Sequence, residues 1–320
     1  ASVARELKRR RFEVLASDIM EYGYTFARAY VQVTSPPESP RLAAELGLHD
    51  GRLETMIAHL NSLPPEPGFI YEHYTPGGNA GQVHGRMYFT PRNGARIDAI
   101  RARLARWKKD GSLDEDAYHT LLAALLEAAD RVANTTGVYA AFVKTWQSNA
   151  LRPLELRAPP LVHGDGCRSA RCDALQTVRD AGDFDLLYLD PPYNSRQYAG
   201  YYHIPELIAR GWFDEPVETR GKTGLLDDAD KRSDWSRSRR CEAAFEELVA
   251  SARCQHIVMS YNSEGIIPEA TIERVLKRHG RRWTYRRYPF TYRRYRADSD
   301  GANRKYRADT VDEYLYCVSR

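Results

Sequence analysis

The peptide Asp190-Pro191-Pro192-Tyr193 contains the residue types that could bind and activate a planar base. It ends a short apolar run, 185–190, that the pattern predicts to be a buried strand. Neither proline has a backbone N–H to donate, so we expect the chain to leave the sheet in a rigid corner. The Asp190 carboxylate and the Pro191 carbonyl would then hold an exocyclic amino group while the Tyr193 ring stacks on the base. The alternative is a strand-ending turn closed by a buried tyrosine.

A second acid, Asp18, ends the apolar run 12–18, which we predict to be a buried strand, and a helix is predicted over 22–31. Strand, acid and helix in this order are typical of the second strand of a doubly wound sheet, where the acid binds ribose hydroxyls. Asp18 could equally cap the N-terminus of the helix.

Two other apparent signals fail. Gly221-Lys222-Thr223 matches part of a nucleotide phosphate loop, but Pro216 stands where that pattern needs glycine. His163, Cys167 and Cys172 have no paired Cys-x-x-Cys and no clear fourth ligand, so no metal site is predicted. The five cysteines at irregular spacing are typical of reduced thiols in a cytoplasmic protein.

The elements that must position the two acids follow an interrupted α/β order. After the first strand and helix, the pattern predicts mainly helices, with Gly111 closing one of them: 41–63, 97–107 and 114–133, with a loop over 71–85. Strands and helices then alternate: strands 185–190 and 256–261, helices 198–210, 241–253 and 269–279 with Gly280 as C-cap, and an antiparallel pair 283–295 and 312–318. We therefore predict a catalytic α/β domain formed by 1–34 and 160–320, interrupted by a helical insertion at 35–159.

The composition agrees with a globular chain: 42% of the 320 residues are hydrophobic and 28% are charged. A run of eighteen apolar residues, which a membrane-spanning helix would need, is missing, and so is the apolar core of a signal peptide. Residues 281–320 carry eleven Lys or Arg against five Asp or Glu, together with seven of the 21 tyrosines. This basic, tyrosine-rich tract suits phosphate contact and base stacking, or else a solvent-facing hairpin with its tyrosines packed inside.

The motif Asp190–Tyr193 resembles the catalytic motif of amino-group methyltransferases that use S-adenosylmethionine. Further segments along nearly the whole chain resemble the alpha-class, Dam-like family of adenine-specific DNA methyltransferases. They are Asn194–Tyr198, Tyr202-His203, Ser260–Gly265, Tyr292–Asp298, Glu313–Tyr316, Tyr88–Thr90 with Asn93, Ile97-Asp98 and Asn134–Tyr139. In that family the cofactor half precedes the target-recognition insertion and the catalytic motif, which is the order of Asp18, 35–159 and Asp190.

The resemblance implies a Rossmann-like methyltransferase sheet with an antiparallel C-terminal hairpin, plus a mainly helical inserted target-recognition region. S-adenosylmethionine would be the methyl donor and adenine in double-stranded DNA the acceptor, flipped out of the duplex into the pocket. The catalytic residues would be Asp190, Pro191, Pro192 and Tyr193. Asp18 would bind the cofactor ribose and Ile19 its adenine, with Asp190 alongside; Asp173 would meet the cofactor amino group, with Asp165 as a competitor. Candidates for DNA contact are Lys144, Arg196, Tyr198, His203 and the arginines of 286–296, Arg293 and Arg294 among them.

Other functions stay open at this point. The same four-residue motif occurs in RNA methyltransferases acting on guanine, and a DNA-binding module that has lost catalysis is the alternative outside enzymes. Cytosine as the target is disfavoured because enzymes of that kind tend to have serine in place of Asp190. We expect a restriction-modification context, with a cognate restriction endonuclease acting separately and no membrane partner.

One family feature is expected upstream of the strand 12–18: a Gly-Ser-Lys-type segment and a Phe-x-Gly-x-Gly loop that let the backbone approach the methionine part of the cofactor. Neither occurs in the 320 residues, and Val3 and Leu7 predict that the chain opens inside a helix. We therefore expect an upstream piece of some tens of residues to be lacking, the strand 12–16 to be poorly covered, and cofactor affinity to be weak.

Overall fold

The computed structural model describes residues 2–226, 231–293 and 310–320. By internal packing these residues divide into two compact units. The first consists of the described residues of Ala1–Cys172 and Ala199–Ala229, and the second of those of Asp173–Tyr198 and Asp230–Arg320. The predicted domain boundaries at 35 and 159 separate a catalytic part from a target-recognition part, whereas these two units are defined by packing alone. The predicted boundaries therefore stay a prediction.

The first unit begins with helix α1 (Ser2–Arg9) and strand β1 (Leu15–Asp18), followed by helix α2 (Glu21–Ala27) and a π-helical turn, η1 (Arg28–Gln32). Strand β1 pairs in parallel with β2 (Arg168–Arg171), and Asp18 lies opposite Arg171. The expectation of a buried strand over 12–18 was wrong in two respects. The strand begins only at Leu15, and Phe12 and Leu15 are exposed rather than buried.

Every residue of the region 35–159 is described, and its regular elements are all helices: α3 (Pro40–Leu46), α4 (Leu53–Ser62), α5 (Phe69–Tyr74), α6 (Asn79–Val83), α7 (Pro91–Lys109) and α8 (Glu115–Arg131). The single helix predicted over 41–63 is two, because Gly47 adopts a left-handed φ of 65° that ends α3. The predicted loop 71–85 contains α6 and the end of α5. The region is therefore mainly helical, as predicted.

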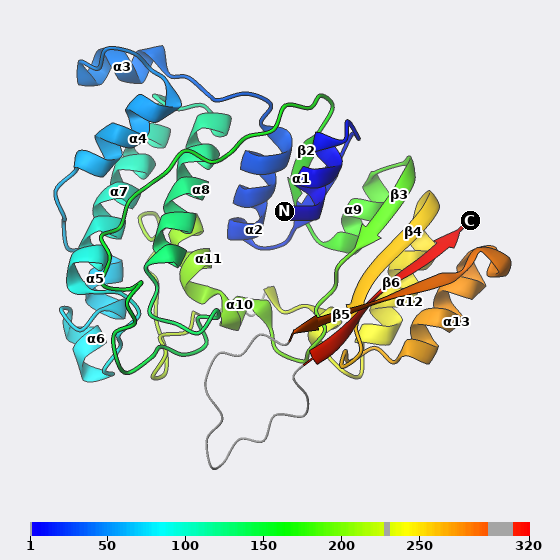
Figure 1. The fold of residues 1–320 in the computed structure, drawn as a ribbon. Helices are drawn as coiled ribbons and strands as arrows, with labels where there is room; N and C mark the ends of the chain where they lie inside the picture. Colours follow the sequence, from blue (N-terminus) through cyan, green and yellow to red (C-terminus); the bar gives the residue numbers. More distant parts are fainter. Residues whose placement is uncertain (1, 227–230, 294–309) are drawn as a thin grey trace. The chain divides into compact units, whose positions relative to one another are not determined.

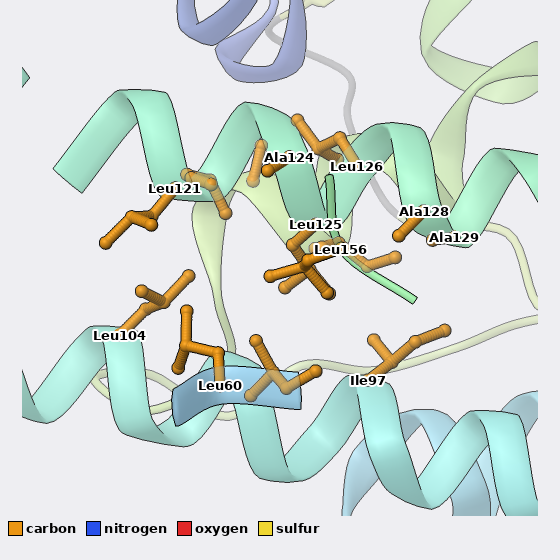
Figure 2. Close-up of a cluster of buried hydrophobic side chains, with 14 of the residues drawn as sticks. Leu60, Ile97, Leu104, Leu121, Ala124, Leu125, Leu126, Ala128, Ala129 and Leu156 are labelled. Carbon is orange, nitrogen blue, oxygen red and sulfur yellow. The ribbon is translucent and has the colours of Figure 1, made fainter. Parts of the chain in front are cut away.

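Local sequence explains the two long helices. The Thr90 hydroxyl accepts a hydrogen bond from the N–H of Asn93 at the start of α7, and the Asp114 carboxylate accepts one from Ala117 at the start of α8. Gly111, with a φ of 68°, turns the chain between them. Their apolar faces meet in a close-packed core (Figure 2), to which α4 contributes Leu60 and the segment after α8 contributes Leu156.

The second unit is built on a four-stranded sheet of order β3-β4-β6-β5. Its strands are β3 (Asp183–Leu189), β4 (Arg253–Asn262), β5 (Arg286–Arg293) and β6 (Thr310–Ser319). β3 and β4 are parallel, whereas β6 runs antiparallel to both β4 and β5, which confirms the predicted closing pair. The fold is thus mixed α/β, with parallel and antiparallel pairing.

Helices α9 (Ala174–Asp180), α12 (Cys241–Ser251) and α13 (Glu269–His279) complete this unit, and Figure 1 shows α12 and α13 along one side of the sheet. The buried residues Ile257, Met259 and Tyr261 alternate along β4 and pack with Phe245 of α12 and Val275 of α13. Gly280 does not form the left-handed C-cap that we expected, because its φ is −133°. It is needed for space instead, since a Cβ there would lie 2.5 Å from Cγ2 of Val318.

The remaining described elements are two short helices after the proline corner, α10 (Tyr198–Tyr201) and α11 (His203–Arg210), and the 3-10 turns η3 (Asp234–Ser236) and η4 (Arg282–Thr284). The helix predicted over 198–210 is therefore interrupted at Tyr202. Among the described helices, none combines the length and the apolar composition that a bilayer crossing requires.

Candidate functional site

The corner after β3 places Asp190, Pro191, Pro192 and Tyr193 at the carboxyl end of a parallel strand. Leu187 and Leu189 are buried in the sheet, opposite Ile257 and Met259 of β4, so the end of β3 is fixed by its packing. Open α/β sheets bind their ligands at this end of the strands. The prediction that the motif directly follows a strand, at the carboxyl end of the sheet, is confirmed.

Two backbone carbonyls of the corner are hydrogen-bonded by β4 and by the segment that follows it. The Tyr261 hydroxyl donates to the Pro192 carbonyl at 3.4 Å, and the N–H of Ile266 donates to the Tyr193 carbonyl at 3.1 Å. The same hydroxyl accepts a hydrogen bond from the N–H of Ile267 at 3.1 Å. The corner is therefore fixed from outside its own sequence.

The three groups to which we assigned chemistry, the Asp190 carboxylate, the Pro191 carbonyl and the Tyr193 ring, take no part in these hydrogen bonds. Within the described residues, no hydrogen bond engages the Asp190 carboxylate or the Pro191 carbonyl, and the Tyr193 side chain is 48% exposed. Asp190 is exposed as well, yet partial desolvation by the surrounding protein raises the pKa of its carboxyl above the ordinary value. Two hydrogen-bond acceptors and an exposed aromatic ring are therefore available to a ligand, on a backbone that is held by hydrogen bonds.

Two residues that sequence reasoning missed support this corner. A Cβ on Gly265 would lie 2.0 Å from the Tyr261 ring, so only glycine leaves that ring in place. The side-chain amide of Gln197 makes two hydrogen bonds to the backbone of Ser233. It accepts from the Ser233 N–H at 2.8 Å and donates to the Ser233 carbonyl at 3.1 Å. Both residues lie inside segments whose resemblance suggested the family. Neither has a side chain whose chemistry would have identified it as a residue of the site.

Asp173, the candidate for the cofactor amino group, precedes helix α9 in the second unit. Its Oδ1 accepts a hydrogen bond from the N–H of Leu175 at 2.9 Å, so it caps that helix, while the residue as a whole is exposed. The competitor Asp165 belongs to the first unit and is also exposed.

Asp18, the candidate ribose ligand, lies at the carboxyl end of β1 in the first unit. Its Oδ1 accepts a hydrogen bond from the N–H of Met20 at 2.8 Å. A Cβ on Gly23 would lie 2.2 Å from the other carboxylate oxygen, Oδ2, so helix α2 approaches this carboxylate as closely as a glycine allows. Ile19, the candidate contact to the cofactor adenine, is 36% exposed beside it.

The electrostatics around Asp18 involve a buried glutamate. Burial, and then the nearby Glu206 carboxylate, raise the pKa of Asp18, while hydrogen bonding to Met20 opposes them. Glu206 is fully buried in α11 and accepts a hydrogen bond from the N–H of Tyr22 at 3.1 Å. This carboxylate thereby satisfies an N–H at the start of α2, the helix that follows Asp18.

The candidates for DNA contact fall in different environments. Lys144 is exposed, on a segment that the Asn134 amide holds through the Val143 carbonyl at 2.8 Å and the Gln147 N–H at 3.0 Å. Arg196 and Tyr198 are exposed after the proline corner. Arg293 lies in β5 opposite Thr310, and Arg294 lies outside the described residues.

His203 differs from the other candidates because its ring is completely buried. Its two nitrogens lie 3.1 Å from the Gly200 carbonyl and 3.2 Å from the Thr223 carbonyl, and burial lowers its pKa to about 4. The structure therefore places this ring in the interior of the first unit rather than on a surface that DNA could reach.

Comparison with known proteins shows what the chain is similar to. A profile of the family described as "D12 class N6 adenine-specific DNA methyltransferase" matches residues 1–273. The Type II methyltransferase M.NlaIII of Neisseria lactamica is 37% identical over 325 residues, which cover 99% of this chain and 87% of that protein. The Type II methyltransferase M.FokI of Planomicrobium okeanokoites and the modification methylase StsI of Streptococcus sanguinis are 33% and 28% identical.

The last two relatives are much longer proteins. Each alignment covers 97% of this chain but only 45% of the relative. No solved structure matches the chain. The profile nevertheless covers most of the chain, including β1 with Asp18, the helical region and the proline corner. The chain therefore belongs to the D12 class of N6 adenine-specific DNA methyltransferases.

Proposed function

We propose that the chain transfers a methyl group from S-adenosylmethionine to the exocyclic nitrogen of adenine in duplex DNA, with Asp190–Tyr193 as its catalytic corner. The observation that carries this proposal is the difference in hydrogen bonding between the groups of the corner. The carbonyls of Pro192 and Tyr193 are hydrogen-bonded to Tyr261 of β4 and to Ile266 after it, whereas the Asp190 carboxylate, the Pro191 carbonyl and the exposed Tyr193 ring are left for a substrate.

These groups have distinct tasks in methyl transfer. Tyr193 stacks on the adenine that has left the duplex, and flipping this base costs a few kcal/mol. The Asp190 carboxylate and the Pro191 carbonyl accept the two N–H bonds of the amino group. An aromatic amine is a poor nucleophile because its lone pair is conjugated into the ring, and the two acceptors favour the pyramidal nitrogen that can attack. Acceleration thus comes from positioning and electrostatics.

The donor set around Asp18 fits the nucleoside part of the cofactor. Members of this family use S-adenosylmethionine, which supplies an activated methyl group on a sulfonium sulfur. The N–H of Met20 is bonded to Oδ1 of Asp18, so we assign the other oxygen, Oδ2, to a ribose hydroxyl, and the exposed Ile19 offers an apolar contact to an adenine ring. We assign Asp173 to the amino group of the cofactor and Asp190 to the methyl-transfer end.

The family implies a Rossmann-like methyltransferase fold, and we assign its parts as follows. The strand pairs β1-β2 and β3-β4 belong to the parallel part, β5 and β6 form the antiparallel C-terminal hairpin, and the helical region 35–159 recognises the target sequence. The exposed Lys144 within that region supports a role in binding DNA. The same role is assigned to Arg196, Tyr198 and the arginines of β5.

We place this activity in a restriction-modification system of the cytoplasm, with a separate endonuclease cutting the unmodified sequence. The support is that two matched proteins are named Type II methyltransferases and a third a modification methylase. All five cysteines are free thiols, which suits a reducing compartment.

The experiment is to express the full chain in cells free of adenine methylation and to map modified bases in their DNA by sequencing. We expect N6-methyladenine within one short recurring sequence, and none in cells that express Asp190→Ala. Parallel assays on duplex DNA and on RNA of the same sequence test the RNA alternative. Methylation of the RNA alone, or of cytosine, would contradict the proposal.

A further inference from the structure

A buried carboxylate connects the start of helix α2 to a helix that follows much later in the chain. Glu206, in α11, is completely buried and accepts a hydrogen bond from the backbone N–H of Tyr22 at 3.1 Å. Tyr22 lies in the first turn of α2, where backbone N–H groups have no acceptor within the helix. The residue before the helix, Met20, makes no side-chain cap hydrogen bond, so Glu206 supplies a cap from another element.

The same stretch of backbone contacts Asp18, the proposed ribose ligand. The N–H of Met20 donates to Oδ1 of Asp18 at 2.8 Å, and a Cβ on Gly23 would lie 2.2 Å from Oδ2. Residues 20–23 therefore contact the Asp18 carboxylate, while Glu206 bonds a backbone N–H within this stretch. A shift of the stretch would displace the Asp18 carboxylate.

Ring packing and backbone hydrogen bonding fix Glu206 itself against α2. The rings of Tyr22 and Tyr202 have centroids 5.6 Å apart, and Tyr202 directly precedes α11. The carbonyl of Tyr202 accepts a hydrogen bond from the N–H of Glu206 at 2.9 Å. The position of the Glu206 backbone is therefore determined by the residue that packs on Tyr22.

The negative charge of Glu206 also acts on Asp18. Burial raises the pKa of Asp18 most, the N–H of Met20 lowers it, and the Glu206 carboxylate raises it again. In β2, Arg171 lies opposite Asp18 and forms an ion pair with Glu21. The elements around Asp18 carry these titratable side chains: Glu21, Tyr22 and Tyr24 in α2, Arg168 and Arg171 in β2 with Cys172 after it, and His203, Glu206 and Arg210 in α11. Of these side chains, Glu206 has the largest effect on the pKa of Asp18.

We propose that Glu206 is a positioning residue for the cofactor. From α11 it holds the start of α2, and it thereby keeps the Asp18 carboxylate oriented toward the ribose hydroxyls of S-adenosylmethionine, without contacting the cofactor itself. This inference rests on the proposed function, which assigns Asp18 to the ribose.

Two properties of Glu206 can be separated by substitution. Its oxygen caps α2, and a glutamine amide oxygen can accept the same hydrogen bond, whereas alanine cannot. Its charge acts on Asp18, and both replacements remove that charge. Glu206→Ala compared with Glu206→Gln therefore tests the hydrogen bond, and Glu206→Gln compared with the unaltered protein tests the charge.

The matched control is Glu127→Gln. Glu127, in α8, is a half-buried carboxylate that accepts a hydrogen bond from the Tyr30 hydroxyl. Tyr30 belongs to η1, the turn that continues α2, so this carboxylate is bonded to the same helical segment but at its other end. Its replacement should leave cofactor binding unchanged.

Binding of S-adenosylmethionine to the full chain is measured by calorimetry without DNA, and thermal unfolding checks that each variant is folded. The first comparison is made at about pH 8, where carboxyl groups are ionised. Glu206→Ala should raise the Kd about tenfold or more, because the start of α2 loses its cap, whereas Glu206→Gln and Glu127→Gln should stay within about twofold of the unaltered protein.

The pH is then lowered in steps. Protonation of Asp18 removes its charge and weakens it as an acceptor for the ribose hydroxyls, so the affinity should fall as the pH falls through the pKa of Asp18. Because the Glu206 carboxylate raises that pKa, Glu206→Gln should keep its affinity to lower pH than the unaltered protein does, and Glu127→Gln should not. A residue that only stabilised the helix would not move this midpoint.

An unchanged Kd in Glu206→Ala, or a pH midpoint in Glu206→Gln equal to that of the unaltered protein, would overturn the positioning role. If Glu206→Ala does not fold, the pH midpoint of Glu206→Gln decides alone. Cofactor binding without methylation of adenine would contradict the proposed function and leave the positioning role in place. Failure of the unaltered protein to bind the cofactor would overturn both.

Discussion

At the scale of single residues, the Asp190 carboxylate is the group on which the proposed chemistry depends. Asp190→Ala should abolish methyl transfer and leave duplex binding within a few fold, because phosphate contacts supply most of the DNA affinity. Turnover and duplex affinity are measured together. Retention of more than about a tenth of the turnover, a loss under about 1.4 kcal/mol, would remove Asp190 from the mechanism.

A matched control for this variant lies on the same strand. Asp183 begins β3, at the opposite end from Asp190, and pairs with Arg253 at 3.2 Å on the surface. Exposed ion pairs contribute little to stability. Asp183→Ala should therefore keep its activity, which separates loss of a carboxylate on this strand from loss of the catalytic one.

The role of Tyr193 can be tested by separating its ring from its hydroxyl. Its backbone carbonyl, not its side chain, is bonded to Ile266, so substitution leaves the corner in place. Stacking on a base is worth about 1–3 kcal/mol, and phenylalanine keeps it. Steady-state kinetics should show Tyr193→Phe close to the unaltered enzyme and Tyr193→Ala strongly impaired. Equal damage in both variants would mean that the hydroxyl matters and would refute the stacking role.

At the scale of elements, the contact between β1 and α2 brings a helix against Asp18, the proposed ribose ligand of the cofactor. Alanine is better than glycine inside a helix by about 1 kcal/mol, so Gly23→Ala should not weaken α2. Its Cβ would nevertheless lie 2.2 Å from Oδ2 of Asp18 and push the carboxylate aside. We expect the KM for S-adenosylmethionine to rise about tenfold or more, a change of about 1.4 kcal/mol.

Gly200→Ala is the control for this prediction, because Gly200 also lies in a helix but has no atom within 4 Å of its added Cβ. Its KM for S-adenosylmethionine should match that of the unaltered protein. An unchanged KM in Gly23→Ala would show that Asp18, in the position described, is not the ribose ligand.

Sequence patterns predicted those elements whose residues differ clearly on their two faces. The stripe of Ile97, Leu104 and Trp107 and the alternation in β4 predicted a helix and a strand where they occur. Strand β2, Arg-Ser-Ala-Arg, has no apolar alternation and was missed, because its position depends on pairing with β1, about 150 residues earlier in the chain. The helix break at Gly47 likewise depends on a left-handed φ that periodicity does not record.

The site divides in the same way. The position of Asp190 and Tyr193 at the end of a strand was predictable from the apolar run before them, and their chemical roles stay a prediction. Tyr261, Gly265 and Gln197 act by holding backbone in place, and their partners lie up to 69 residues away. His203 was taken for a DNA contact on its residue type, whereas its burial depends on tertiary packing that no local pattern reveals.

At the scale of the whole molecule, buried histidines link stability to pH. His119 is almost fully buried, with Nδ1 3.2 Å from the Thr25 hydroxyl, and burial, then Lys108 and Arg28, lower its pKa to about 4. Between pH 6.5 and 4, the His119 ring therefore binds a proton in the unfolded chain but stays neutral in the folded chain. The free energy of unfolding should fall as the pH falls, by at most about 3 kcal/mol for this histidine.

Urea denaturation at pH 7 and pH 5 measures this effect when the unaltered protein is compared with His119→Gln, which has no titratable ring. The comparison is needed because Asp98, whose pKa burial raises to about 6, changes stability in the opposite direction. The variant should lose less stability on acidification. Identical losses in the two proteins would contradict the assignment.

The fastening of the proline corner by Tyr261 also has a meaning for protein synthesis. When the ribosome has joined Tyr193, the hydroxyl that holds Pro192 is still 68 residues from being made, and β6, which pairs with β4, is further off. A nascent chain that ends before Tyr261 therefore has the proposed catalytic residues but lacks the hydroxyl that bonds the corner. We therefore expect methylating capacity to arise only late in translation, and unfinished copies to contribute no modification.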